Sequence, residues 1–315
     1  MKQTSLSAIP EETGLAADPA ALAGGCDCHT HVFADPGDFP FAPTRSYTPQ
    51  TAEAAQLAAH LRALGLGRVV VVQPSVYGLD NGATLHAIET LGRASARGVA
   101  GIDVERVTDA ELDRLHAGGM RGIRLNLETD GIASAEEGRR LLEAAARRVG
   151  GRGWHVQIHA RLALIAGLAD AMPTLGVPVV LDHFGGTRAS TSPAHPDFVR
   201  LLAAVRSGAV YVKLSAGHLC AIRNDDFSPL QPLVRALVDA RADRMVWGSD
   251  WPHPNPGAGV PAHQPCPPHR VDDRAALAAL RRSVADDAVF RQIMVSNPER
   301  LYGFEHYEHR QEIAP

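Results

Sequence analysis

Two histidines, His29 and His31, stand two residues apart at the end of a short apolar segment. Side chains of a strand alternate between its two faces, which predicts both imidazoles on one face with Asp27, and Cys28 on the other. Two imidazoles at a strand end converge on one point, which suits a metal ion or a polarised substrate oxygen. Such a pair alone is a weak signal and gains weight only from further ligands.

Three other apolar segments end in the same kind of residue. They finish at His159, His183 and Asp250. Imidazole nitrogen and carboxylate oxygen are the usual ligands of Zn²⁺ and similar ions, and a catalytic site keeps one coordination position open for water. The alternative is coincidence among fifteen histidines. Because all of these residues lie at segment ends, we interpret them as one site.

Eight short segments rich in valine and isoleucine alternate with segments of helical period. The expected strands are 26–32, 68–73, 98–103, 121–126, 154–159, 177–183, 209–214 and 244–250. The expected helices are 51–64, 83–92, 109–117, 135–148, 162–175, 196–205, 229–240 and 272–284. Two of these helices begin with a capping-box pattern, at Thr108 with Glu111 and at Ser134 with Glu137.

Strict alternation of strand and helix predicts a parallel sheet covered by helices, and eight such units close a (β/α)8 TIM barrel of the α/β class. The alternative is a doubly wound open sheet. That fold usually carries a glycine-rich nucleotide loop after its first strand, and the sequence contains neither GxGxxG nor GxxxxGK[ST]. In a barrel, the carboxyl ends of the strands share one mouth, where active sites lie.

A proline-rich segment, 251–270, directly follows the last expected strand and holds seven prolines. This position predicts that it lies over the mouth of the barrel, either as a lid or as an ordinary long loop. His253 lies in this segment and is expected to reach the site and contact substrate.

Arg124 in the fourth expected strand faces inward by alternation. A buried guanidinium stays charged and needs an anionic partner. That partner is either a substrate carboxylate or an internal carboxylate, with Asp27, Asp103 and Asp250 as the candidates. Lys213 also faces inward and is expected to have a structural role.

The composition bounds the class of protein. The 315 residues are 45% apolar, and 31 basic residues nearly balance 35 acidic ones, for a net charge of −4. This balance argues against a nucleic-acid partner, and no apolar run reaches the ~18 residues that span a bilayer. Four cysteines without a CxxC pair favour a reduced, cytoplasmic chain. We expect one barrel over residues 25–305, a flexible tail over 1–24 without the apolar core of a secretory signal, and a short tail over 306–315.

Several longer strings match a known family. They include Asp27-Cys-His-Thr-His31, Gly122-Ile-Arg-Leu-Asn126, Trp247-Gly-Ser-Asp-Trp-Pro-His253 and Asn297-Pro-Glu-Arg-Leu301. The chain resembles the amidohydrolase superfamily over about residues 26 to 304. Within it, the chain is most similar to the branch of 2-pyrone-4,6-dicarboxylate lactonase and the related muconolactone and sugar-lactone hydrolases.

The resemblance implies roles for individual residues. The implied ligands of one divalent metal, Zn or Mn, are His29, His31, His159 and Asp250. The resemblance implies that His183 assists the water or the substrate, and that Tyr47, Ser75 and Arg124 hold the substrate. Barrels of this kind often pair through outer helices, so we also expect a homodimer.

Two departures from the pyrone lactonase affect the interpretation. That enzyme works without metal and has a tyrosine where this chain has His159, so the complete ligand set here favours a metal. It also uses further arginines to hold a dicarboxylate. This chain has Glu128 in the corresponding region after Asn126, and 215–218 reads Ser-Ala-Gly-His. A lactone with one carboxylate, or a sugar lactone, therefore fits better than the pyrone dicarboxylate.

The predicted activity is hydrolysis of a small carboxylated lactone. Asp250 would deprotonate a water, bound to metal or not, and return the proton to the leaving oxygen. In a metal-free site, histidine donors would stabilise the oxyanion. The alternatives are metal-dependent decarboxylation of an aromatic or muconate-type acid, and isomerisation of a lactone. A non-catalytic barrel that binds a ligand is the alternative from another class.

Overall fold

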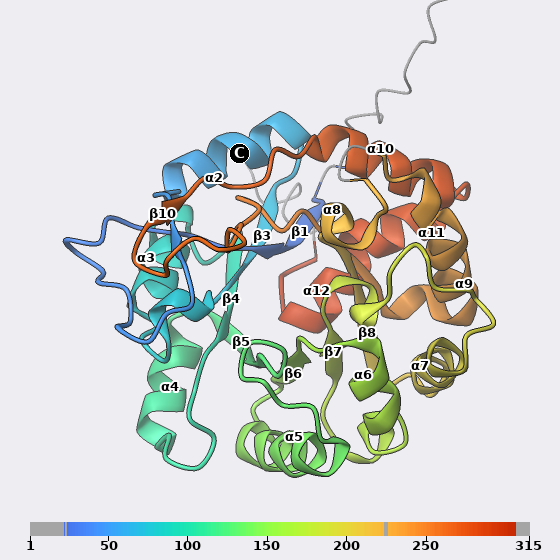
Figure 1. The fold of residues 1–315 in the computed structure, drawn as a ribbon, viewed down its shortest axis with the longest axis horizontal. Coiled ribbons are helices and arrows are strands. Elements are labelled where there is room, and N and C mark those ends of the chain that lie inside the picture. The colour runs from blue at the N-terminus through green and yellow to red at the C-terminus, as the bar shows by residue number, and fades with distance from the viewer. Residues whose placement is uncertain (1–21, 23, 224–225, 307–315) are drawn as a thin grey trace, which may run out of the picture.

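Eight parallel strands follow one another around the centre of the protein in chain order (Figure 1). The computed structural model describes residues 22, 24–223 and 226–306. The barrel strands are β1 (Cys26–Thr30), β3 (Arg68–Val72), β4 (Ala96–Ala100), β5 (Met120–Leu125), β6 (His155–Ile158), β7 (Val179–Leu181), β8 (Val210–Ser215) and β9 (Met245–Gly248). All eight predicted strands are present, and the predicted (β/α)8 barrel is confirmed.

The ring closes between its first and last strands. The Asp250 N–H donates to the His29 carbonyl at 2.8 Å, and the His31 N–H donates to the Trp251 carbonyl at 2.7 Å. The seam of the barrel therefore passes between the residues predicted to form the site.

Helices lie outside the ring between successive strands (Figure 1). They are α2 (Ala54–Leu64), α3 (Gly82–Leu91), α4 (Asp109–Ala117), α5 (Ala135–Val149), α6 (Leu162–Leu168), α7 (Pro196–Arg206) and α9 (Gln231–Arg241). After β9 come α10 (Asp273–Ser283), α11 (Asp287–Arg291) and α12 (Asn297–Tyr302), and a short α8 (Gly217–Cys220) follows β8. Thr108 and Ser134 cap α4 and α5 as predicted, each accepting from the backbone N–H three residues on.

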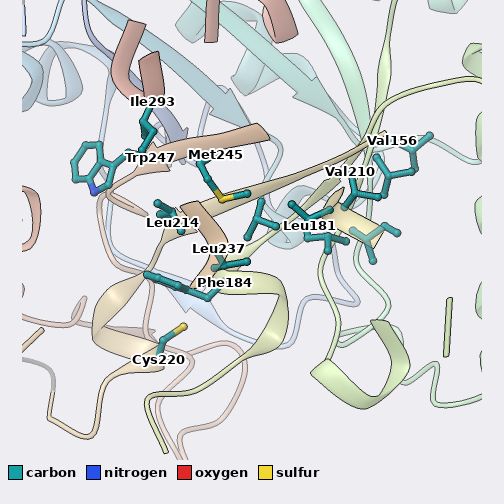
Figure 2. Packing of buried hydrophobic residues seen from close by; sticks show 14 of the residues in the cluster. Val156, Leu181, Phe184, Val210, Leu214, Cys220, Leu237, Met245, Trp247 and Ile293 are labelled. Carbon is teal, nitrogen blue, oxygen red and sulfur yellow. The ribbon is translucent and has the colours of Figure 1, made fainter. Parts of the chain in front are cut away.

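The outer faces of the strands pack against these helices. Figure 2 shows Val156, Leu181 and Val210 from three consecutive strands in one buried layer, with Leu237 of α9 nearby. The inner faces contribute a separate apolar cluster that fills the ring and includes Val70. Burial of both faces explains the continuous apolar runs 69–72 in β3 and Val179–Leu181 in β7.

Two helix boundaries differ from the prediction for local reasons. α6 ends at Leu168 instead of residue 175, because Pro173 has no N–H and its ring would collide with the carbonyl of Ala169 in a continuous helix. α2 begins at Ala54 instead of residue 51, because Glu53 and Gln56 form a reciprocal capping box.

One prediction about faces is wrong. The pairing of β1 with β3 shifts register between Asp27 and Thr30, which marks a bulge. As a result Asp27 faces the helices, with its Oδ2 3.7 Å from Nε2 of His60 in α2. Cys28 belongs to the inner apolar cluster instead of the outer face. An extra residue in a strand breaks the two-residue alternation on which the prediction relied.

The proline-rich segment is attached to the rim. Its short strand β10 (Pro265–Cys266) pairs in parallel with β2 (Thr48–Pro49), and the Thr48 hydroxyl donates to the Ala262 carbonyl at 2.7 Å. The segment passes across the β1 side of the barrel (Figure 1). A lid function stays a prediction.

The two tails expected at 1–24 and 306–315 stay predictions. Most of the predicted N-terminal tail, 1–21 and 23, and most of the C-terminal tail, 307–315, lie outside the described residues. Leu22 is buried in the core. None of the helices in the described ranges is long and apolar enough to cross a membrane. The homodimer and the cytoplasmic location stay predictions.

Candidate functional site

His29, His31 and Asp250 meet at the seam of the barrel. Nε2 of His29 and Nε2 of His31 each lie 3.5 Å from Oδ1 of Asp250, and all three side chains are buried. One potential ligand atom from each residue lies within 4.8 Å of the others. The backbone bonds across the seam fix this arrangement, because they hold β1 and the end of β9 in register.

The hydrogen bonds of His31 leave a lone pair directed at this centre. Nδ1 of His31 lies 2.8 Å from the Val72 carbonyl and must donate to it. Nε2 is then the unprotonated nitrogen of the neutral ring and faces Asp250. Metal-ligating histidines are commonly oriented in this way by a carbonyl on the other nitrogen.

The donor set fits a divalent cation. Nε2 of His29 is buried and has no hydrogen-bond partner in the part of the chain that the structure describes. Two imidazole nitrogens and a carboxylate oxygen that converge on one point match the ligand preferences of Zn²⁺ and similar ions.

His159 and His183 stand beside this centre. Nδ1 of His159 lies 3.0 Å from Oδ1 of Asn126, which leaves its Nε2 free, and its ring lies 5.1 Å from that of His183. The His183 ring is 4.7 Å from the His29 ring, and its Nδ1 is 3.0 Å from the Ser215 hydroxyl. His159 is not within the compact group of His29, His31 and Asp250.

The surroundings of the site shift the pKa of His159 and of Asp250 downward. Burial, and after it the charge of the nearby Arg124, lowers the pKa of His159 to about 4. Burial raises the pKa of Asp250, but the imidazoles of His183, His31 and His29 outweigh burial and hold it well below its usual range. Asp250 is therefore an anion at neutral pH.

Backbone conformations that non-glycine residues rarely adopt gather at this end of the barrel. The φ angles are 48° at His183, 51° at Ala216, 71° at Asp250 and 65° at His253. Each such residue costs of order 1–3 kcal/mol and is typical of sites that hold a side chain in a fixed direction.

The predicted substrate-binding residues also converge on the mouth. The Tyr47 hydroxyl bonds that of Ser75, and burial and the charge of Asp250 together raise its pKa well above the usual range. Arg124 donates from Nε to Oδ2 of Asp182 at 2.9 Å. The internal partner of Arg124 is thus Asp182 and none of the three predicted carboxylates.

The sequence did not indicate the buried polar network that lies beneath His29, His31 and Asp250. Oδ1 of Asp182 lies 3.2 Å from Nδ1 of His29. Its Oδ2, which already accepts from Arg124, also accepts a hydrogen bond from the side-chain amide of Gln157 at 3.0 Å. Lys213 donates to Gln157 at 2.7 Å and lies 3.3 Å from Nδ1 of His29. The position of Asp182 next to His183 at a strand end was the available signal. The expected structural role of Lys213 did not include contact with His29.

The sequence also did not indicate that the side chains of His218, His253 and His269 pack together at the mouth of the barrel. Nε2 of His218 lies 3.9 Å from Oδ2 of Asp250. The centre of the His218 ring is 5.2 Å from that of the His253 ring and 5.4 Å from that of the His269 ring. Nε2 of His253 is 3.0 Å from Asp273. His253 therefore lies beside His218 at the mouth, and its contact with substrate stays a prediction. His218 follows the left-handed turn at Ala216, which no sequence pattern predicts.

Comparison with known proteins identifies the family of the chain. The family model described as amidohydrolase matches residues 26–304. A 2-pyrone-4,6-dicarboxylate hydrolase of Comamonas testosteroni is 34% identical over 290 residues, which cover 89% of this chain and 90% of the relative. A 4-sulfomuconolactone hydrolase of Hydrogenophaga intermedia is 30% identical over 281 residues, 89% of each chain. A D-galactarolactone isomerase of Agrobacterium fabrum is 26% identical and covers 92% of this chain and 94% of the relative.

Solved structures agree on the architecture. A Pseudomonas putida structure, provisionally described as a 2-pyrone-4,6-dicarboxylic acid hydrolase, superimposes with a TM-score of 0.72 at 29% identity and covers 90% of this chain and 98% of that one. An amidohydrolase from Burkholderia multivorans with bound zinc has a TM-score of 0.64 at 18% identity, over 89% of this chain and 99% of that one. At that identity the second likeness shows the fold alone.

Proposed function

The chain belongs to the amidohydrolase family, and from that premise we propose that it hydrolyses a small lactone at the seam of the barrel. The observation that carries the proposal is the carboxylate of Asp250 held as an anion among His29, His31 and His183 at the mouth. The two relatives that are 30% or more identical and are named above are both lactone hydrolases, which supports the same reaction class.

Asp250 is proposed to act as the general base. A water between Asp250 and the lactone carbonyl carbon gives its proton to the carboxylate as its oxygen attacks. The C–O bond of the ring then breaks, and the proton passes from Asp250 to the leaving oxygen. The product is a hydroxy acid or its enol form. The fixed φ of 71° directs this carboxylate into the mouth.

The neighbouring histidines are proposed to stabilise the charge that develops on the carbonyl oxygen. His183 is held by Ser215 at Nδ1, so its Nε2 is the atom available to the substrate. Donors that are preorganised in this way are worth about 3–4 kcal/mol each. His29, His31 and Asp250 would hold a divalent metal, with His159 as the proposed fourth ligand. Such a metal supplies a Lewis acid and lowers the pKa of water toward ~7.

The substrate is proposed to carry one carboxylate at most. Arg124 uses Nε for Asp182 and makes no hydrogen bond from its two Nη groups to any described residue, so it offers one face to an anion. Its charge is already matched by Asp182, which limits the attraction for a second negative group. Tyr47 and Ser75 offer neutral hydroxyls beside it.

Isomerisation of a lactone is the second candidate. The Agrobacterium relative is a lactone isomerase, and a carboxylate that takes a proton from water can instead move it between two substrate oxygens. The decarboxylation predicted as an alternative has no counterpart among the relatives named above.

An assay of candidate lactones separates these reactions. Hydrolysis releases one acid equivalent per turnover, isomerisation releases none, and decarboxylation releases CO2. The test uses hydroxylated lactones with no, one or two carboxylates, with pH-stat and CO2 detection. We expect acid release that is fastest with one carboxylate. Ligand-induced thermal stabilisation without turnover of any substrate would instead favour a binding protein.

A further inference from the structure

Lys213 is a fully buried amine that contacts His29, a proposed metal ligand, at the ring nitrogen that does not face Asp250. It lies in β8, in the wall of the barrel, with a side chain that is 0% exposed. Its Nζ is 3.3 Å from Nδ1 of His29, in a geometry that makes a hydrogen bond. An ammonium has only donors, so in this contact Nδ1 of His29 must accept.

Asp182 competes for the same nitrogen. Its Oδ1 lies 3.2 Å from Nδ1 of His29 yet has no hydrogen-bond partner among the described residues. Its Oδ2 is already occupied by Arg124 and Gln157. Oδ1 therefore lies between two groups that can donate to it, Nδ1 of His29 at 3.2 Å and, at the longer distance of 3.8 Å, Nζ of Lys213.

The two contacts require different tautomers of His29. When Lys213 donates to Nδ1, the ring proton sits on Nε2 and points toward Asp250, so His29 cannot bind a metal. When Nδ1–H donates to Asp182, Nε2 has a free lone pair toward Asp250 and His31. Lys213 and Asp182 thus favour opposite forms of one ring.

We propose that Lys213 is a positioning residue that opposes metal binding by holding His29 in the Nε2–H tautomer, and that Asp182 favours metal binding by accepting from Nδ1. The centre then has two forms, a hydrogen-bonded form without metal and a metal-accepting form. Lys213 and Asp182 set the balance between them. The inference rests on the proposed metal site and not on the identity of the substrate.

The wild-type protein supplies the first test. Nitrogen-15 NMR of the metal-free protein, labelled at histidine, reports which ring nitrogen of His29 carries the proton, with a His29→Gln variant to assign the signal. We expect Nε2–H in the metal-free protein and Nδ1–H after addition of Zn²⁺. A metal-free protein with Nδ1–H on His29 would overturn the proposal without any variant.

Two substitutions are expected to act in opposite directions. The Zn²⁺ dissociation constant of metal-stripped protein is measured by competition with a chromophoric chelator. Lys213→Met should tighten Zn²⁺ binding and Asp182→Asn should weaken it, each by about tenfold or more, in the range of residues that orient a metal ligand. Lys213→Met should also move the ring proton to Nδ1. Damage to the fold would weaken binding in both variants.

Arg124→Met is the matched control, because it removes a cation from the same carboxylate without touching Nδ1 of His29. It should leave the His29 tautomer unchanged and shift the dissociation constant less than Lys213→Met does. Equal tightening in Arg124→Met and Lys213→Met, with the same tautomer in both, would mean that charge alone acts and would overturn the proposal. These readouts do not depend on lactone hydrolysis.

Discussion

The backbone N–H of Asp250 donates to the carbonyl of His29 at 2.8 Å, while the His29 side chain lies 3.5 Å from the Asp250 carboxylate. The same two residues thus join the ends of the barrel and form the core of the site. A change that loosens the seam is therefore expected to alter the chemistry before it unfolds the ring.

Replacement of Asp250 with Asn should abolish turnover and keep the fold. Asn tolerates the left-handed φ of 71° and has the same shape, but its amide does not accept a proton from water. We expect kcat to fall by about 10³-fold or more, within the range of losses of a general base. Steady-state kinetics and thermal unfolding measure both effects. Near-normal turnover would remove Asp250 from the mechanism.

Replacement of Arg124 with Met should affect both binding and stability. The substrate loses a charge-assisted hydrogen bond, so KM for a carboxylated lactone should rise about 10- to 100-fold. Asp182 also loses a buried partner, which costs about 3–5 kcal/mol in comparable pairs. An uncharged lactone is the control, and its KM should change little. A similar rise of KM for both substrates would show that Arg124 does not contact the carboxylate.

Acid should destabilise the metal-free protein between pH 6.5 and about 4. Burial lowers the pKa of His29, His159 and His218 to about 4 from an ordinary value of 6.5. In this window the unfolded chain binds more protons than the folded one, so the free energy of unfolding falls as the pH falls. Thermal unfolding across the window measures the slope, and His159→Gln should reduce it. A melting temperature that is constant from pH 7 to 4 would contradict these pKa values.

Gly122 in β5 should tolerate no side chain. A Cβ at this position would overlap the ring of His155, which is buried in the neighbouring strand. Overpacking of this kind costs about 1–3 kcal/mol, so Gly122→Ala should lower the melting temperature. Because the clash is with one ring, Gly122→Ala combined with His155→Ser should lose less stability than the sum of the two single changes. Additive losses would place the strain elsewhere.

Metal content should follow the donor set at the seam. Protein purified without added metal should contain about one equivalent of Zn or Mn by elemental analysis, as expected for a single catalytic site. A chelator should lower activity, and the same metal should restore it. His31→Gln should lose metal, because His31 presents a lone pair at Nε2. Fully active protein without metal would favour the hydrogen-bonded form of the centre.

The sequence predicted the strands, and the convergence of several polar side chains at their ends, because both follow from short-range patterns. Apolar runs gave all eight strands, and the residues at their carboxyl ends had to share one mouth once the ring was closed. His29, His31 and Asp250 meet for that reason, whereas Tyr47 and Ser75 were indicated only by the resemblance to a known family.

The missed features depend on backbone irregularities or on partners distant in the chain. The bulge in β1 turned Asp27 outward, and alternation within a single strand does not reveal an extra residue. The left-handed Ala216 turned His218 into the mouth. The partner of Arg124 is Asp182, 58 residues away, and no local pattern links the two.

Closure of the ring through His29 and Asp250 also has a consequence for synthesis. His29 and His31 leave the ribosome long before Asp250 does, so every nascent or truncated chain that stops short of β9 lacks the proposed general base and has an unpaired edge on β1. Catalytic competence should therefore arise only at the last stage of folding, and activity would serve as a direct reporter of complete chains.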